Sequence, residues 1–302
     1  MPEPQSDLSV VIAAYNEAAG IATVLETLRS ALPESEIIVV DDASSDRTAD
    51  LARAHAGVRV YRHPFNRGQG AALKTGMLLA TRRYVAWFDA DNEHRVEDLD
   101  RLLRIISGKH VAAVIGQRTT GSATRVRGVG KFFIRLVGRG LGIKAGSDLN
   151  CGLRVFRREV ILRYLPLIPN RFSASLVSTL VMLEQRYPIL FEPVETNPRI
   201  GNSSVRLRDG FEATLQLIRA ILLFAPMRFF LPIGLVSLGI GIIYSLFIAM
   251  SFGLGIPVAG MLLILASVLV IMLGLIADQI SQMRVGALSG SAAVEVGPDD
   301  AV

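Results

Sequence analysis

The stretch YVAWFDADNEH, residues 84–94, decides the fold. Its first half, Tyr84 to Phe88, is mostly apolar and predicts a short buried strand. Two carboxylates, Asp89 and Asp91, follow at once. Charged groups at the end of a buried strand are costly unless something pairs with them. We therefore expect this pair to have a binding partner.

Similar apolar runs occur before and after this stretch, separated by segments with helical spacing. The predicted strands are 8–14, 37–40, 58–61 and 111–116, and the predicted helices are 17–32, 45–54, 71–82 and 96–106. This alternation predicts an α/β domain whose mostly parallel sheet is covered on both faces. Ligands of such sheets bind at the carboxyl ends of the strands.

Polar residues follow three of these strands. Tyr15 and Glu17 follow the strand at 8–14, and Asp41 and Asp42 close the strand at 37–40. Asp89 and Asp91 close the strand at 84–88. Several carboxylates at one sheet edge repel each other unless a divalent cation with a bound phosphate relieves the repulsion. The pattern therefore predicts a metal that neutralises a diphosphate.

Simpler explanations exist for the single motifs. Asp91 or Asn92 could cap the helix predicted at 96–106. FNRGQGAALKTG, residues 65–76, lacks both the P-loop spacing and a dinucleotide fingerprint, so Lys74 either reaches a phosphate or is a solvated helix charge.

Composition limits the compartment and the partners. The only cysteine, Cys151, excludes an intramolecular disulfide, fits a reducing compartment and is expected to pack in the core. The four histidines show no metal-ligand spacing. The net charge is +5, and 31 of the 32 lysines and arginines lie at or before Arg228. A basic domain suits anionic lipids, nucleotides or nucleic acids.

No charge occurs between Arg228 and Asp278. Residues 229–249 and 258–277 each supply the roughly 20 apolar residues that a membrane span needs, and SFGLGIP between them predicts a turn. The alternative is a buried helix pair in a soluble protein.

The flanking arginines place the N-terminal domain and the C-terminus in the cytoplasm by the positive-inside rule. The run at 8–14 is too short for a signal peptide. We expect a cytoplasmic domain at 1–217, a juxtamembrane helix with two spans at 218–280, and a disordered tail at 281–302.

Two further segments are basic. The stretch 129–141 predicts either an interfacial helix or one packed on the domain, with Lys131, Arg135 and Arg139 on one face. PRIGNSSVRLRDGF, residues 198–211, suits an anionic ligand or anionic lipid.

Taken in order, these motifs resemble family 2 glycosyltransferases of the polyprenyl-phosphate branch, the dolichyl-phosphate mannose synthase type. The matching stretches are VVIAAYNE (10–17), IIVVDDASSDRT (37–48), NRGQGAALKTG (66–76), WFDADNEH (87–94), DLNCGLRVFRR (148–158) and RIGNSS (199–204). The resemblance implies a GT-A (Rossmann-like) domain and transfer of one sugar, with inversion, from a GDP- or UDP-sugar to a polyprenyl phosphate. It implies no nucleic-acid partner and leaves a homo-oligomer open.

The resemblance also assigns roles to residues. The nucleoside would contact Ala13, Tyr15, Glu17, Val40 and Asp42. Mg²⁺ or Mn²⁺ and the diphosphate would lie near Asp89, Ala90, Asp91 and Glu93, with Lys74 as a further donor contact. Arg118 would sit near phosphates, Asp148 close to the acceptor, and Arg199 and Ser203 in a loop over the donor phosphates.

Three departures from the family pattern matter. Ala13 replaces the usual Pro, Glu93 stands where many relatives have Gln, and Ser204 replaces the usual Lys, a loss that Arg206 or Arg208 would have to compensate. The processive signature Gln-x-x-Arg-Trp is absent, because the only tryptophan is Trp87. This favours single transfer over polymerisation.

Three alternatives remain open at this stage. One is transfer to the hydroxyl of another lipid, which needs a general base. Another is a non-enzymatic membrane scaffold that binds a nucleotide, and the third is a nucleotidyltransferase that releases pyrophosphate. The sequence does not identify the sugar, the base or the lipid chain length.

Overall fold

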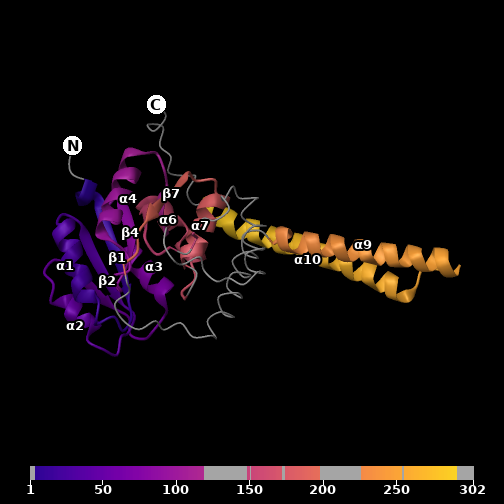
Figure 1. The fold of residues 1–302 in the computed structure, drawn as a ribbon, viewed down its shortest axis with the longest axis horizontal. Helices are drawn as coiled ribbons and strands as arrows, with labels where there is room; N and C mark the ends of the chain where they lie inside the picture. The colour runs from indigo at the N-terminus through magenta and orange to yellow at the C-terminus, as the bar shows by residue number, and fades with distance from the viewer. Residues whose placement is uncertain are drawn as a thin grey trace. The chain divides into compact units, whose positions relative to one another are not determined.

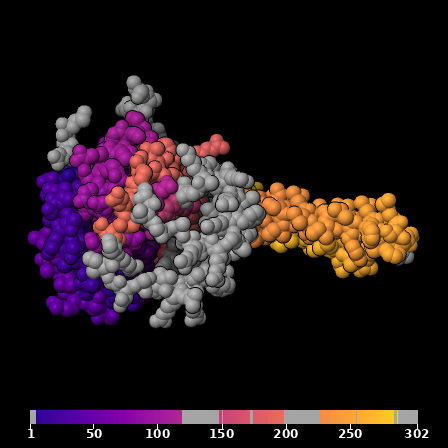
Figure 2. Space-filling model, in the orientation of Figure 1, coloured from indigo at the N-terminus to yellow at the C-terminus, as the bar shows by residue number. Residues whose placement is uncertain are grey.

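The computed structural model of the chain describes residues 4–118, 148–149, 151–171, 174–197, 226–253 and 255–290. These residues belong to two compact units, residues 4–197 and residues 226–290, shown as ribbons in Figure 1. In the space-filling view the indigo and magenta segments of the first unit form one continuous surface (Figure 2). The segment 129–141, the loop with Arg199 and Ser203, and residues 291–302 lie outside the described residues.

A seven-stranded sheet forms the centre of the first unit, in the order β3-β2-β1-β4-β6-β5-β7. Its strands are β1 (Leu8–Ala14), β2 (Glu36–Asp41), β3 (Val58–Arg62), β4 (Tyr84–Asp89), β5 (Ala113–Arg118), β6 (Arg154–Arg157) and β7 (Ile189–Val194). All neighbours are parallel except β6, which is antiparallel to β4 and to β5. The mostly parallel sheet expected from the sequence is confirmed.

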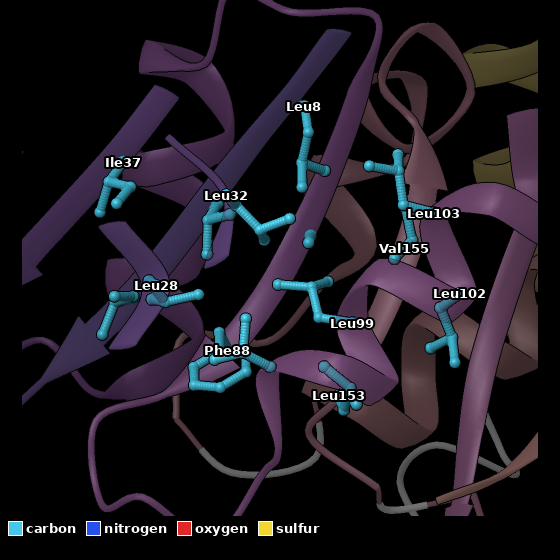
Figure 3. Close-up of a cluster of buried hydrophobic side chains, with 14 of the residues drawn as sticks. Leu8, Leu28, Leu32, Ile37, Phe88, Leu99, Leu102, Leu103, Leu153 and Val155 are labelled. Atoms are coloured by element: carbon cyan, nitrogen blue, oxygen red, sulfur yellow. The ribbon is translucent and has the colours of Figure 1, made fainter. Parts of the chain in front are cut away.

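Helices cover both faces of the sheet. They are α1 (Ile21–Ala31), α2 (Thr48–Arg53), α3 (Gln69–Leu79), α4 (Val96–Gly108), α6 (Arg158–Arg163) and α7 (Ala174–Glu184), with 3₁₀ turns η1 (Pro4–Asp7) and η2 (Leu165–Leu167). Leu28 of α1 and Leu99 of α4 share one buried cluster with Leu8 and Phe88 (Figure 3). Strand side chains alternate between the faces, so Val11 points to the other face, where α3 packs against β1.

The first predicted helix starts later than expected. α1 begins at Ile21 rather than at residue 17. The preceding amides of Glu17 and Ala18 donate instead to the side chains of Thr48 (2.9 Å) and Asp46 (3.1 Å). These contacts tie the loop after β1 to the loop after β2, so they shape the carboxyl edge of the sheet.

The second unit consists of α9 (Met227–Phe252) and α10 (Val258–Gly290), which lie side by side (Figure 1). Both are long and apolar enough to cross a membrane, with mean hydropathies of 2.2 and 2.8. Only 17% of the residues in the most apolar stretch of each helix are buried, whereas the core helix of a soluble protein is mostly buried. A lipid environment would cover the exposed apolar faces.

Small residues allow α9 and α10 to approach closely, as is usual for helices in membranes. A Cβ atom at Gly234 would lie 2.4 Å from the Ile271 side chain. The hydroxyl of Ser267 donates to that of Ser237 across the pair at 2.8 Å. α10 also reaches Gly290, whereas a disordered tail was expected from residue 281. Gln, Met, Arg, Ala and Leu in this segment are good helix formers, which outweighs its content of small residues.

Candidate functional site

The strand register brings three of the predicted site residues into one row. Ala13 of β1 pairs with Val40 of β2 on one side and with Asp89 of β4 on the other. Ala14 lies next to Asp41. The carboxyl ends of β1, β2 and β4 therefore meet at one edge, as the sequence predicted.

The loop after β1 is fixed by the loop after β2. The amide of Asn16 donates to Ser44 Oγ at 2.9 Å, and its side-chain oxygen accepts from the amide of Ser45 at 2.9 Å. Asn16 itself has a positive φ of 56°, which asparagine tolerates better than most residues. Tyr15 is left 49% exposed at this edge, where its ring can stack on a planar ligand.

Asp42 is turned inward. It is 2% exposed, and its carboxylate accepts hydrogen bonds from His63 Nδ1 (2.6 Å) and from the amides of Arg67 (2.9 Å) and Gly68 (2.7 Å). His63 in turn contacts Thr75 Oγ1 at 2.9 Å. Three of the roughly four acceptor positions of a carboxylate are thus used to hold this loop. Asp42 is at the edge expected for the nucleoside, but its carboxylate stabilises the loop that leads into α3.

Lys74, expected either to reach a phosphate or to be a solvated helix charge, is partly buried on α3. Its ammonium group donates to the carbonyl of Ile168 at 3.0 Å. Burial, together with the charge of Arg67, lowers its pKa. The amide of Ala71 donates to Asn170 O at 2.8 Å, so the start of α3 is also occupied by this neighbouring segment. Lys74 therefore holds the segment near residue 168 to α3.

Asp89 lies at the edge of the sheet with its side chain 29% exposed. Its Oδ2 is 3.1 Å from Nε2 of the buried His94. Burial opposes protonation of His94, but the hydrogen bond and charge of Asp89 outweigh it and raise the pKa of the imidazole. A Cβ atom at Gly152 would lie 2.2 Å from Asp89 Oδ2, so only glycine lets that segment approach the carboxylate.

Asp91 belongs to a tight turn after β4. It is 7% exposed and accepts a hydrogen bond from the amide of Glu93 at 3.0 Å, while Asn92 has a φ of 62°. Arg95 occupies the N-cap position of α4, so neither Asp91 nor Asn92 caps this helix. Ala90, between the two acids, is buried.

Arg118, at the end of β5, joins two acids from distant parts of the chain. Its Nε donates to Asp148 Oδ2 at 2.6 Å, and its Nη1 donates to Glu93 Oε1 at 3.3 Å. Burial disfavours the charged guanidinium, but Asp148 in particular outweighs this and raises the pKa of Arg118. The structure thus brings together Glu93, Arg118 and Asp148, to which the resemblance gave three separate roles.

Asp89, Asp91 and Glu93 do not form a preformed metal-binding site. Among the described residues no group of three His, Cys, Asp or Glu side chains is arranged to hold a metal ion. Glu93 contacts Arg118, and Asp89 contacts His94. If a cation binds here, part of its coordination has to come from a ligand.

Arg154 supports the candidate site from within the core, and the sequence reasoning assigned it no role. It is fully buried in β6, and its guanidinium donates to the carbonyls of Cys151 (3.0 and 2.5 Å) and Leu149 (3.3 Å). It also donates to Ser175 O at 2.7 Å in α7 and lies 5.4 Å from the centre of the Trp87 ring. Burial lowers the pKa of Arg154 to about 10, so it stays charged at neutral pH. The segment that carries Asp148 is therefore attached to α7 through this cation.

The exit of β7 runs beside the DADNEH turn. The amide of Asn197 donates to Glu93 O at 2.9 Å, and His94 forms an isolated antiparallel bridge with Thr196. Asn197, the last residue described before the RIGNSS segment, therefore contacts the turn that carries Glu93.

Comparisons with known proteins agree with this geometry. The model of glycosyl transferase family 2 matches residues 9–164, and that of the GtrB C-terminal hairpin matches residues 225–283. A dolichyl-phosphate beta-glucosyltransferase of Dictyostelium discoideum is 27% identical over 240 residues, 71% of this chain and 72% of that protein. An undecaprenyl-phosphate 4-deoxy-4-formamido-L-arabinose transferase of Serratia proteamaculans is 29% identical over 203 residues, 61% of this chain and 62% of that protein.

A solved structure is similar in fold. Glucosyl-3-phosphoglycerate synthase of Mycobacterium tuberculosis, crystallised with Mn²⁺, UDP and glucosyl-3-phosphoglycerate, superposes with a TM-score of 0.60 at 22% identity. The match covers 73% of this chain and 81% of that one. At this level of identity the likeness concerns the fold alone.

Proposed function

The chain belongs to glycosyl transferase family 2 and is a glycosyltransferase with the expected GT-A fold, and we propose that it transfers one sugar from a nucleotide sugar to a polyprenyl phosphate. The observation that carries the proposal is the Glu93–Arg118–Asp148 group beside the Asp89–Asp91 pair. The acids can hold a metal-bound diphosphate, and the guanidinium of Arg118 can bind the phosphate of the acceptor. The similar proteins named for dolichyl and undecaprenyl phosphate support this acceptor class.

The donor would bind across the row of Ala13, Val40 and Asp89. The small side chain of Ala13 leaves room there, and Tyr15 can stack on the base. Glu17, whose amide is fixed by Thr48, lies in the same loop.

Asp89 and Asp91 would hold Mg²⁺ or Mn²⁺, because carboxylate oxygens are the preferred ligands of these cations. Asp89 fits this role through its partly exposed carboxylate at the sheet edge. Oxygens of the donor diphosphate would complete the coordination, which explains why two acids suffice. When bound, the cation neutralises the leaving nucleoside diphosphate.

The acceptor phosphate would bind at Arg118. A phosphate offers the guanidinium the same two-oxygen geometry as a carboxylate, so it can replace Glu93 there. A phosphate oxygen then attacks the anomeric carbon, the bond from that carbon to the diphosphate breaks, and the configuration inverts. The acceptor is already anionic at neutral pH and needs no strong base. Asp148 therefore orients Arg118 and the acceptor rather than removing a proton.

The hairpin α9–α10 would sit in the membrane that holds the lipid acceptor. Arg228 in the first turn of α9 and Arg284 after the apolar part of α10 flank one end of the hairpin, and the loop between the helices is uncharged. By the positive-inside rule this charge pattern supports the proposal that these ends, and with them the catalytic domain, are cytoplasmic.

A transfer assay tests the proposal. The full chain in detergent receives undecaprenyl or dolichyl phosphate, Mg²⁺ or Mn²⁺, and a panel of radiolabelled UDP- and GDP-sugars. We expect label in the organic phase only when lipid phosphate and metal are both present. The nucleotide sugar that gives labelled lipid identifies the sugar that is transferred. Nucleotide binding without labelled lipid for any donor would overturn the proposal.

Two variants test whether Asp91 is needed for transfer. Asp91→Asn should lower transfer by about 100-fold or more, while Asp50→Asn, which changes an exposed acid of α2, should leave it unchanged. Full activity of Asp91→Asn with added Mg²⁺ or Mn²⁺ would refute the metal assignment.

A further inference from the structure

Four arginines meet at the amino end of β4, the opposite edge of the sheet from the candidate site. Arg82 and Arg83 precede β4, Arg157 ends β6, and Arg158 begins α6. The antiparallel register pairs Tyr84 with Arg157. The amide of Arg158 also donates to Arg83 O at 2.9 Å. Two arginine pairs that are distant in the sequence are thus brought side by side.

These arginines surround a cavity of about 250 Å³. Its other lining residues are Thr81 and Glu159. A water molecule takes roughly 30 Å³ of liquid volume, so the cavity has room for a phosphate group with some of its hydration. We call this the arginine cavity.

Part of the arginine cavity is preorganised. Arg157 Nε donates to Val111 O at 2.8 Å, and its Nη2 donates to Lys109 O at 3.2 Å. The guanidinium carbons of Arg83 and Arg157 lie 5.5 and 6.0 Å from the centre of the buried Tyr84 ring. Both contacts restrict where these cations can move. A site with held side chains loses less entropy when it binds a ligand.

In the described part of the chain, one acid stands against four arginines in the lining of the arginine cavity. Among the described residues no carboxylate forms a salt bridge with any of the four arginines. Glu159 is the only acid in the lining. Arg158 Nε is buried and has no hydrogen-bond partner there. A group of like charges is unfavourable, and an anion bound in the arginine cavity would relieve it.

We propose that the arginine cavity binds the phosphate group of a second ligand, separate from the donor and the acceptor. Guanidinium groups favour phosphate because their planar N–H pairs match two of its oxygens at once. The phosphate can belong to an anionic phospholipid headgroup or to a soluble phosphorylated compound. The length of β4 separates this cavity from Asp89 by roughly 16 Å at about 3.3 Å per residue, so the proposal is independent of the catalytic assignment.

Binding of inorganic phosphate to the full chain in detergent tests the proposal, with calorimetry as the readout. Arg83→Gln/Arg158→Gln should weaken phosphate binding by about tenfold or more. The control Arg53→Gln/Arg163→Gln, which removes the same charge from exposed positions, should bind like the wild type. Arg118→Gln separates the two edges, because it removes the proposed acceptor-phosphate contact and leaves the arginine cavity intact.

Equal phosphate binding by the wild type and Arg83→Gln/Arg158→Gln would overturn the proposal, as would binding lost only in Arg118→Gln. An unchanged melting temperature without phosphate shows that the double variant is folded. A second arm compares short-chain phosphatidylglycerol with short-chain phosphatidylcholine, both below their micelle concentrations. Tighter binding of phosphatidylglycerol than of inorganic phosphate identifies a lipid headgroup, and the reverse order identifies a soluble phosphate.

Discussion

Replacing Arg154 with methionine should reduce catalysis more than stability. The guanidinium supplies hydrogen bonds to Leu149 O and Cys151 O, and it links them to Ser175 O in α7. Methionine fills much of the same space but donates nothing. The segment that presents Asp148 to Arg118 would then lose its attachment to α7.

The magnitude follows from two opposing effects. Two buried carbonyls, those of Leu149 and Cys151, lose a donor, and each unsatisfied group costs about 1–3 kcal/mol. The variant also no longer buries a cation. Burial lowers the pKa of Arg154 from 12.5 to about 10, and at about 1.4 kcal/mol per pKa unit this relieves roughly 3 kcal/mol. The net loss of stability is therefore about 3 kcal/mol or less.

The relief from burying a cation does not offset the loss of catalysis, because the position of Asp148 relative to Arg118 depends on the lost contacts. We expect Arg154→Met to lower kcat at least about tenfold with little change in the KM for the nucleotide sugar. The kcat of Arg154→Lys, which keeps the charge but has fewer hydrogen-bond donors, should lie between those of the wild type and Arg154→Met. Added methylguanidine should partly restore kcat of Arg154→Met.

The measurements are thermal unfolding and initial transfer rates of the full chain in detergent, with Arg163→Met as a control at an exposed arginine of α6. A wild-type kcat for Arg154→Met would refute the reasoning. So would a loss of kcat that only mirrors unfolding and that methylguanidine does not restore.

Three further predictions concern other parts of the molecule. Asp148→Asn should lower kcat about tenfold or more in the transfer assay because Arg118 loses its charged partner, and an unchanged kcat would contradict this. Burial raises the pKa of the Cys151 thiol from 9.0 to about 11, so iodoacetamide at pH 9 should alkylate it only after unfolding. The pKa of this thiol is higher in the folded than in the unfolded chain, so its contribution to stability is present below pH 9.0 and is lost as the pH rises through about 11. Equal alkylation rates of the folded and the unfolded chain would exclude the raised pKa. Gly274→Leu should lower the melting temperature in detergent and weaken hairpin packing, because a Cβ atom there would lie 2.6 Å from Phe230 Cβ; an unchanged melting temperature would argue against the close helix contact.

The sequence predicted the strands that build the site because their apolar runs are short and end abruptly. β1, β2, β3, β4 and β5 lie within two residues of the predicted bounds. Individual polar roles were harder to predict. Asp42 looks like any acid at a strand end, and only the fold shows that the amides of Arg67 and Gly68 turn it inward.

Arg154 was missed for a related physical reason. A buried arginine is usually recognised by a carboxylate partner, but its partners here are mainly backbone carbonyls and the hydroxyls of Ser178 and Thr179. Carbonyl positions depend on how β6 and α7 pack, and no residue pattern encodes them. The contact of Lys74 was not predictable for the same reason, since its acceptor is the carbonyl of Ile168.

The three acids of DADNEH have different neighbours, and this bears on the order of substrate binding. Asp89 faces His94, whereas Glu93 shares Arg118 with Asp148. A phosphate that binds Arg118 competes with these two carboxylates, so it is favoured once a cation near Asp89 and Asp91 attracts Glu93 away from the guanidinium. We therefore expect acceptor affinity to rise when donor and metal are bound. Equal lipid-phosphate binding by the chain with and without UDP and Mg²⁺ would exclude this coupling.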